Sequence, residues 1–334
     1  MVRFRLMPLE DTGLWADVRE LPDALALTLE RAEGVAEAAD LLRGPDVRRI
    51  VATGNGAAYY VAHALWLAAL ETSAEGPPIV AVPAGLATRD GFRWRPGDVV
   101  LAVSSSGEFR DVVAIAAGDR PCVAVTAQPG SALAGAATAT VVQHLSAQRA
   151  VTHTQALCGA YACTLALWAA VTRDRELPAV LAGAAEAAAR AVAAAEAWTA
   201  PDELERPGAA VAAGGGTAWA AALELALMLK EIARVPAEGV ETREGATSAM
   251  FGLDRGHLMV ALDPPGDAAS EEAMRLCATA GARTLRLPHV DADQRLAPIT
   301  TLPAAAALAA TLALAGGHDV DHPCWTDAYY ATAR

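Results

Sequence analysis

The chain has 334 residues, of which 26 are basic and 39 acidic, so its formal net charge is −13. This length suggests two domains, and the acidic balance argues against nucleic-acid binding, which rests on Lys and Arg. Apolar residues make up 54% and charged residues 19%, which excludes a disordered chain and supplies large cores. No apolar signal core follows Met1, and the five cysteines form no CxxC pair. We therefore expect a cytoplasmic protein that does not bind membranes.

Short apolar segments alternate with helical patterns along the first half of the chain. After an N-terminal arm and a helix over 24–29, we predict strands at 48–52, 79–82, 98–103, 122–126 and 139–143. Helices are predicted between them at 57–70 and 109–117, and after the last strand at 155–171. This alternation is typical of βαβ units and a parallel sheet.

The second half repeats the plan of strand, glycine-containing turn and helix. Strands are predicted at 209–213, 258–262 and 284–287, and helices at 178–200, 219–232 and 302–314. The spacing of about 160 residues indicates an internal duplication rather than a short-period repeat. The apolar runs Leu157–Val171 and Leu302–Ala315 fall short of the roughly 20 residues of a membrane helix, so we expect buried helices.

Two loops of the first half are candidates for anion binding. Gly54, Asn55 and Gly56 follow one predicted strand, and Ser104, Ser105, Ser106 and Gly107 follow another. Ligands of open parallel sheets bind beyond the carboxyl ends of the strands, where glycine amides and hydroxyls suit a phosphate. Serines at such positions also serve as ordinary helix caps. Neither a Walker A motif nor GxGxxG is present, which argues against a nucleotide site.

The helix around 222–232 carries two carboxylates seven residues apart. Glu224 and Glu231 share one helical face, and Glu231 stands beside Lys230, the only lysine of the chain. A carboxylate in apolar surroundings has a raised pKa and can shuttle a proton. The alternative is a solvated Lys–Glu pair on the surface. His318-Asp319-Val320-Asp321-His322 has metal-ligand residue types, but it lies in a tail, and we expect no metal and no cofactor.

Taken together, these segments resemble proteins with tandem sugar isomerase (SIS) domains, in particular the isomerase half of glucosamine-6-phosphate synthase and its stand-alone relatives. The matching segments, with the family pattern in parentheses, are Glu20-Leu21-Pro22 (E-x-P), Gly54-Asn55-Gly56 (G-T-S), Ser104-Ser105-Ser106-Gly107-Glu108 (S-Q-S-G-E), Val151–Thr154 (a Ser/Thr-rich loop), Ala222–Ile232 (A-L-E-x-A-x-x-L-K-E-I), Pro236-Ala237-Glu238 (H-A-E) and Gly317–Pro323 (G-x-D-V-D-x-P).

The resemblance implies an α/β fold with two SIS domains, each a parallel sheet between helical layers in the flavodoxin-like manner. The implied domains are 35–175 and 208–316, with an N-terminal arm and helix over 1–34, a helical linker over 176–207 and a C-terminal tail over 317–334. It also implies site roles: Glu231 as the base of an enediol reaction, with substrate contacts from Gly54, Asn55, Gly56, Ser104, Ser105, Ser106, Thr152, Glu224 and Lys230.

The chain departs from the family pattern at several positions. Phe109 stands where a phosphate-binding Thr is usual, Met228 replaces a sugar-binding Lys, and Thr247 falls where a ring-opening His is expected. Ala328 and Cys324 replace a Lys and an Arg of the tail. A phosphosugar aldose–ketose isomerase, expected to act on an aminosugar phosphate, or a related deaminase or deglycase is therefore favoured over the synthase reaction. A non-catalytic phosphosugar sensor and an isomerase for an unphosphorylated sugar derivative remain alternatives.

The family resemblance also implies a homodimer. In the family, the loop after the catalytic helix completes the site of a neighbouring subunit. Here that loop is expected at Glu238–Ala249, and Arg243 within it is a candidate for contact with the partner's phosphate loop, or otherwise a solvated surface residue. Symmetric dimers are the commonest homo-oligomers.

Overall fold

The computed structural model describes residues 9–72, 75–198 and 205–333. Parts of the predicted arm (1–8), linker (199–204) and tail (334) lie outside the described residues. The chain forms two compact units. Unit A comprises 22–146, 155–185 and the C-terminal residues from 327; unit B comprises 147–154 and the described residues within 1–21 and 186–326.

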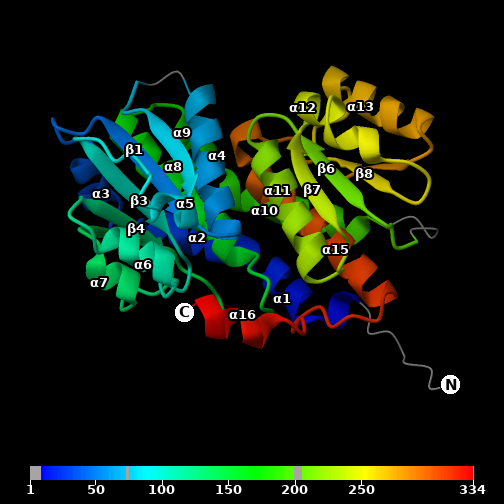
Figure 1. Cartoon of the computed structure of the whole chain (residues 1–334), viewed down its shortest axis with the longest axis horizontal. Helices are drawn as coiled ribbons and strands as arrows, with labels where there is room; N and C mark the ends of the chain where they lie inside the picture. The colour runs from blue at the N-terminus through cyan, green and yellow to red at the C-terminus, as the bar shows by residue number, and fades with distance from the viewer. Residues whose placement is uncertain (1–8, 73–74, 199–204, 334) are drawn as a thin grey trace. The chain divides into compact units, whose positions relative to one another are not determined.

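Unit A is built on a five-stranded parallel sheet with strand order β2-β1-β3-β4-β5 (Figure 1). Its strands are β1 (Arg49–Gly54), β2 (Ile79–Pro83), β3 (Asp98–Val103), β4 (Cys122–Thr126) and β5 (Ala139–Val142). Its helices are α2 (Leu21–Arg31), α3 (Val35–Leu42), α4 (Ala57–Glu71), α5 (Ala84–Ala87), α6 (Arg110–Ala116), α7 (Ala132–Ala136), α8 (Gln155–Thr172), α9 (Leu177–Ala182) and α16 (Thr326–Ala333).

Helices cover both faces of this sheet. Helices α3, α4 and α8 pack on one face, and α5, α6 and α7 on the other. Strands β1, β3 and β4 are buried almost throughout, which explains why their sequences are apolar without alternation. The predicted α/β class is confirmed, and the predicted strand positions hold within a residue or two.

Unit B has a four-stranded parallel sheet with strand order β7-β6-β8-β9. Its strands are β6 (Ala210–Gly214), β7 (Ala237–Glu241), β8 (Leu258–Ala261) and β9 (Arg283–Arg286). Its helical elements are η1 (Leu9–Asp11), α1 (Gly13–Arg19), α10 (Ala184–Ala197), α11 (Ala218–Glu231), α12 (Thr242–Ala246), η2 (Ala249–Gly252), α13 (Ala268–Thr279), η3 (Gln294–Leu296), α14 (Ala297–Thr300) and α15 (Leu302–Ala315). Helices α12 and α13 pack on one face of the sheet, and α11 packs on β6 and β7 with α15 behind it.

The two apolar helical segments are core helices. By length and composition, residues Gln155–Thr172 and Gln294–Ala315 could cross a membrane. However, 83% and 89% of their most apolar 18-residue stretches are buried inside the protein. A membrane span would expose these side chains to lipid. The burial confirms the prediction that both segments serve as interior helices.

The segment predicted as a polar loop at Glu238–Ala249 is not a loop, and this prediction is wrong. The structure forms edge strand β7 and helix α12 there. β7 pairs with β6 on one side only, and Glu238 is exposed, so an edge strand accounts for its polar sequence. The predicted tail likewise contains helix α16.

The two sheets share one detail that supports the predicted duplication. A Cβ added at Gly54 would meet atoms of Ala58 at 2.7 Å, and one at Gly214 would meet atoms of Ala218 at 2.5 Å. Two residues later, Gly56 and Gly216 both have φ of +54°, in the left-handed region that only glycine enters freely. The turn from strand to helix is therefore built the same way in both units.

Candidate functional site

The two predicted anion loops of unit A lie side by side. Strands β1 and β3 are neighbours, and Thr53 pairs with Ala102, so the loops beginning at Gly54 and Ser104 leave the same edge of the sheet. The chain runs from β1 to β2 on one side and returns to β3 on the other. This is a topological switch point, where open α/β sheets bind their ligands.

The serine loop is held in place by its own backbone and by its neighbours. The Gly107 N–H donates to Ser104 Oγ at 3.1 Å, and Ser105 O accepts from Thr126 Oγ1 and the Ala127 N–H at 3.0 and 3.1 Å. Ser104 is buried, while Ser105 and Ser106 are partly exposed. Ser104 Oγ is therefore engaged within the turn, whereas the side chains of Ser105 and Ser106 are partly open to solvent.

An aromatic cluster adjoins the serine loop. The ring of Phe109, which follows the loop, lies 6.1 Å from that of Tyr329 and 6.5 Å from that of Tyr330, both on α16. The Arg110 guanidinium also donates to the main-chain oxygen of Thr332. Phe109 thus joins the C-terminal helix to the end of the loop, at the position where the resemblance led us to expect a phosphate-binding hydroxyl.

The predicted base lies in unit B, near the end of α11. Thr152 Oγ1 donates to Glu231 Oε2 at 3.3 Å, and Thr152 is only 3% exposed. Burial raises the pKa of the Glu231 carboxyl to about 7, against the opposing effects of the Thr152 hydrogen bond and the charge of Lys230. Glu231 is only partly exposed, and a carboxylate poised near neutral pH is suited to move protons.

The other predicted residues of this helix divide into buried and exposed ones. Glu224 is 3% exposed, and burial together with the charge of Glu231 raises its pKa well above 4.5. Met228, on the same face, is fully buried. Lys230 is exposed and acts on Glu231 through its charge rather than through a hydrogen bond given by the structure. The structure therefore brings together Thr152, Glu224 and Glu231.

The segment that carries Thr152 is fixed by two aspartates. The fully buried Asp17 of α1 accepts from the N–H groups of Arg149 and Ala150 at 2.8 and 2.9 Å. Asp321 accepts from the N–H groups at the start of α1, and its own main-chain oxygen accepts from Val151 at 3.0 Å. Sequence analysis missed Asp17 and treated Asp321 only as part of a tail motif. Both aspartates position Thr152 for its contact with Glu231.

The tail reaches the base as well. The Trp325 indole N–H donates to the main-chain oxygen of Glu231 at 3.2 Å, close to the end of α11. Sequence analysis did not single out Trp325. The histidines and aspartates around it form no metal-binding group within the part of the chain that the structure describes.

At the carboxyl-terminal edge of the unit B sheet, a side chain of the protein bridges the segments that follow the strands. Asp263 follows β8 and accepts from the Gly215 N–H and from Thr242 Oγ1, both at 2.7 Å. Asp263 thus takes the place that the serine loop has in unit A, and a carboxylate there repels a phosphate. Burial raises the pKa of Asp263. The two switch points of the described residues therefore differ: the loop after β3 carries serines, and the segment after β8 carries a carboxyl.

Arg243 and Thr247, to which the sequence comparison drew attention, both contact residues near them in unit B. Arg243 pairs with Glu272 on α13 at 3.1 Å, and both are exposed, so the hypothesis of a free Arg243 aimed at a partner's phosphate loop gains no support. Thr247 Oγ1 donates to Glu244 O at 2.9 Å, which is a local helix-end contact. Neither arrangement substitutes for a ring-opening histidine.

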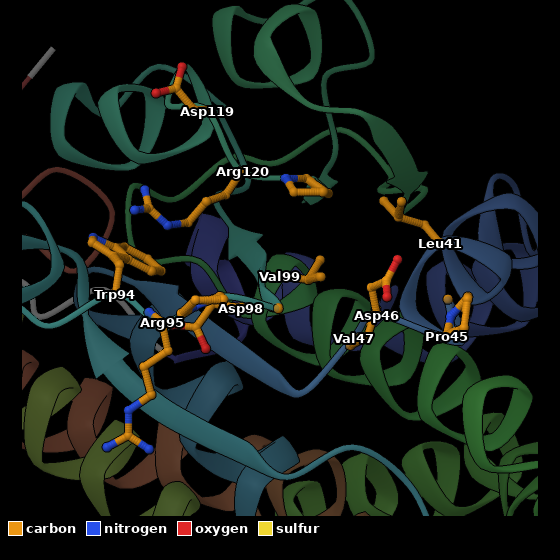
Figure 2. A pocket seen from close by; sticks show the side chains of 14 residues that line it. Leu41, Pro45, Asp46, Val47, Trp94, Arg95, Asp98, Val99, Asp119 and Arg120 are labelled. Carbon is orange, nitrogen blue, oxygen red and sulfur yellow. Dashed lines mark hydrogen bonds between the residues drawn. The ribbon is translucent and has the colours of Figure 1, made fainter.

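A cavity of about 660 Å³ opens at the opposite, amino-terminal edge of the unit A sheet. Figure 2 shows Trp94 and Arg120 on one side of it and Asp46 on the other, and the Arg120 guanidinium lies 4.5 Å from the Trp94 ring centroid. None of the predicted site residues lines this cavity. Its polar groups are acidic and basic in mixture, which defines no class of ligand.

The sequence matches no protein-family model and no curated protein, whereas the fold has solved counterparts. A protein of Silicibacter pomeroyi proposed to be a phosphosugar isomerase is 26% identical, with a TM-score of 0.75 over 93% of this chain and all of that one. The C-terminal domain of glucosamine-fructose-6-phosphate aminotransferase from Francisella tularensis is 18% identical, with a TM-score of 0.76 over 95% of this chain and all of that one. Tagatose-6-phosphate ketose/aldose isomerase from Escherichia coli is 17% identical, with a TM-score of 0.71 over 96% of this chain and all of that one. The two parallel sheets with their helical layers thus form the fold of these sugar-phosphate proteins, as the resemblance implied.

Proposed function

We propose that the protein is an enzyme that moves a proton between two adjacent carbons of a phosphosugar, as an aldose–ketose isomerase or a related deaminase or deglycase. The observation that carries the proposal is Glu231, a partly buried carboxyl with a pKa of about 7 that accepts a hydrogen bond from Thr152. The solved structures of this fold include proteins whose names give phosphosugars as substrates.

The proposed chemistry needs only a base and a substrate that can form an enediol. Ionised Glu231 takes the proton from the carbon next to the carbonyl, the carbonyl oxygen takes a proton from water, and the enediol forms. Glu231 then returns its proton to the former carbonyl carbon, and the hydroxyl on the other carbon gives its proton to water and becomes the new carbonyl, which leaves Glu231 ionised again. The Thr152 hydroxyl stabilises the ionised carboxylate, and Trp325 fixes the main chain at the end of α11.

We propose that the phosphate binds at the unit A switch point. The Gly54–Gly56 turn supplies backbone N–H groups at the start of the fifteen-residue helix α4, and Ser105 and Ser106 supply hydroxyls. Such groups suit a phosphate without a cation. Asn55 is partly exposed at the same edge and is proposed to contact the sugar.

A second candidate is an isomerase for an unphosphorylated sugar derivative. Phe109 and the tyrosines of α16 form an apolar cluster directly after the serine loop, whereas a phosphate prefers hydrogen-bond donors. Affinity measured for a sugar and for its 6-phosphate separates the candidates. A preference of 100-fold or more for the phosphate, about 2.7 kcal/mol, would exclude the second candidate.

The proposal is tested by incubating the protein in deuterated water with aldose and ketose 6-phosphates and their 2-amino derivatives. Incorporation of deuterium at C2, followed by NMR, is expected for at least one of them. Binding of a sugar phosphate without any exchange at pH 8 would overturn the enzyme proposal. That outcome would favour the non-catalytic sensor, especially if Glu231→Gln binds the same ligand equally well.

A further inference from the structure

Helix α11 carries two carboxyls on one face with a thioether between them. Glu224, Met228 and Glu231 stand at i, i+4 and i+7 of Ala218–Glu231, so their side chains follow one another along the helix. Glu224 is 3% exposed and Met228 0%. Two carboxylates in such surroundings are costly unless a cation or a proton compensates their charge.

The elements packed against α11 supply few charges. Strand β6 and helices α14 and α15 contain no titratable side chain. Strand β7 contributes Glu238, which is exposed, and Glu241, which accepts from the Glu244 N–H. These two groups add negative charge rather than a counterion.

The remaining titratable groups lie at the end of α11 that carries Glu231. Lys230 is exposed and acts on Glu231, and Arg149 is paired with Asp17 and Glu20. His153 follows Thr152 in the segment that contacts Glu231. Glu224 Oε2 is buried and has no hydrogen-bond partner within 9–72, 75–198 and 205–333. Lys230 is therefore exposed and Arg149 is engaged elsewhere, and a proton is the remaining compensation for the charge of Glu224.

We infer that Glu224 is held protonated, so that the carboxyl pair of α11 carries a single negative charge and the ionisation of Glu231 is not opposed by a second buried charge. Its effect on catalysis rests on the proposed function, whereas its protonation does not. The directions of the two pKa shifts agree with a protonated Glu224 and an ionised Glu231. Burial raises the pKa of Glu231 to about 7, so Glu231 ionises first, and its charge then raises the pKa of the buried Glu224 further.

The protonation is tested by unfolding in urea between pH 5 and pH 8, comparing the wild type with Glu224→Gln, which keeps the shape without the ionisation. A group whose pKa is raised in the folded state contributes stability that is complete below its unfolded pKa, near 4.5, and is lost as pH rises toward the folded value. The folding constant of the wild type relative to the variant is therefore expected to fall about tenfold per pH unit. A ratio independent of pH would overturn the inference.

That Glu224 adds no negative charge beside Glu231 is tested by the pH dependence of C2 deuterium exchange. Glu224→Gln replaces one neutral group by another, so the acidic midpoint is expected within about 0.3 pH unit of the wild type, whatever the maximal rate. Met228→Lys places a cation between the carboxyls and is expected to lower that midpoint by about one unit or more, with Met228→Leu as the matched control. A midpoint lowered by a full unit in Glu224→Gln would show an ionised Glu224 and refute the inference. If no substrate exchanges at all, the proposed function fails, and the urea measurement still decides the protonation of Glu224.

Discussion

The hydrogen bond from Thr152 to Glu231 gives a sharp prediction for Thr152→Val. The valine keeps the shape of the side chain and removes the donor, so the ionised form of Glu231 loses stabilisation and its pKa rises. Hydrogen bonds to charged groups contribute about 1.5–3 kcal/mol. The separation of 3.3 Å places this one at the weak end, about 1.5 kcal/mol. At about 1.36 kcal/mol per unit, the pKa is expected to rise by about one unit from its value of about 7.

The assay is the rate of C2 deuterium exchange between pH 5.5 and 9.5. At pH 7 the ionised fraction of Glu231 would fall from about one half to about one tenth, so the rate should drop about fivefold and recover above pH 9. The matched control is Thr154→Val, because Thr154 is fully buried and its hydroxyl has no partner among the described residues. An acidic midpoint that stays in place or moves down in Thr152→Val would refute the assigned role of the hydroxyl.

Three further predictions concern stability and assembly. Asp17→Ala leaves two N–H groups of the Thr152 segment without their acceptor and should cost about 2–4 kcal/mol in urea unfolding, whereas Glu20→Ala, which removes an exposed ion pair, should cost under about 1 kcal/mol; equal losses would contradict the positioning role. Gly56→Ala forces alanine to a φ of +54° and should cost about 1–3 kcal/mol and weaken phosphosugar binding, while Gly130→Ala, which meets open space, should leave both unchanged. The predicted homodimer should give a mass of twice 34.3 kDa in light scattering, and a mass near 34.3 kDa at micromolar concentration would reject it.

Sequence predicted best the features that depend on the pattern of neighbouring residues along the chain. Apolar runs such as Asp98–Val103 are buried on both faces of the sheet, and glycine and serine follow the strands at the switch point. The spacing of Glu224 and Glu231 places both on one helical face, as the structure shows. Strand β7 escaped prediction because an edge strand with exposed glutamate lacks the apolar run of an inner strand.

The residues that hold the site segments in place were not predicted, for a different reason. Asp17 accepts hydrogen bonds mainly from main-chain N–H groups far along the sequence, and Asp263 accepts one such bond. Main-chain donors require no particular partner residue. A buried aspartate therefore leaves no spacing that sequence alone can identify. The Trp325 contact with the end of α11 spans distant parts of the chain in the same way.

The most direct test of the account is Glu231→Gln, assayed for C2 deuterium exchange at pH 8 on any sugar phosphate that the wild type turns over. Glutamine keeps the shape of the side chain and can no longer accept the proton. Because a positioned general base contributes about 10²–10⁴-fold, the rate is expected to fall by at least about 100-fold, while calorimetry shows affinity for the sugar phosphate within about threefold of the wild type. A variant that binds the substrate and exchanges its C2 proton at the wild-type rate would show that Glu231 is not the base.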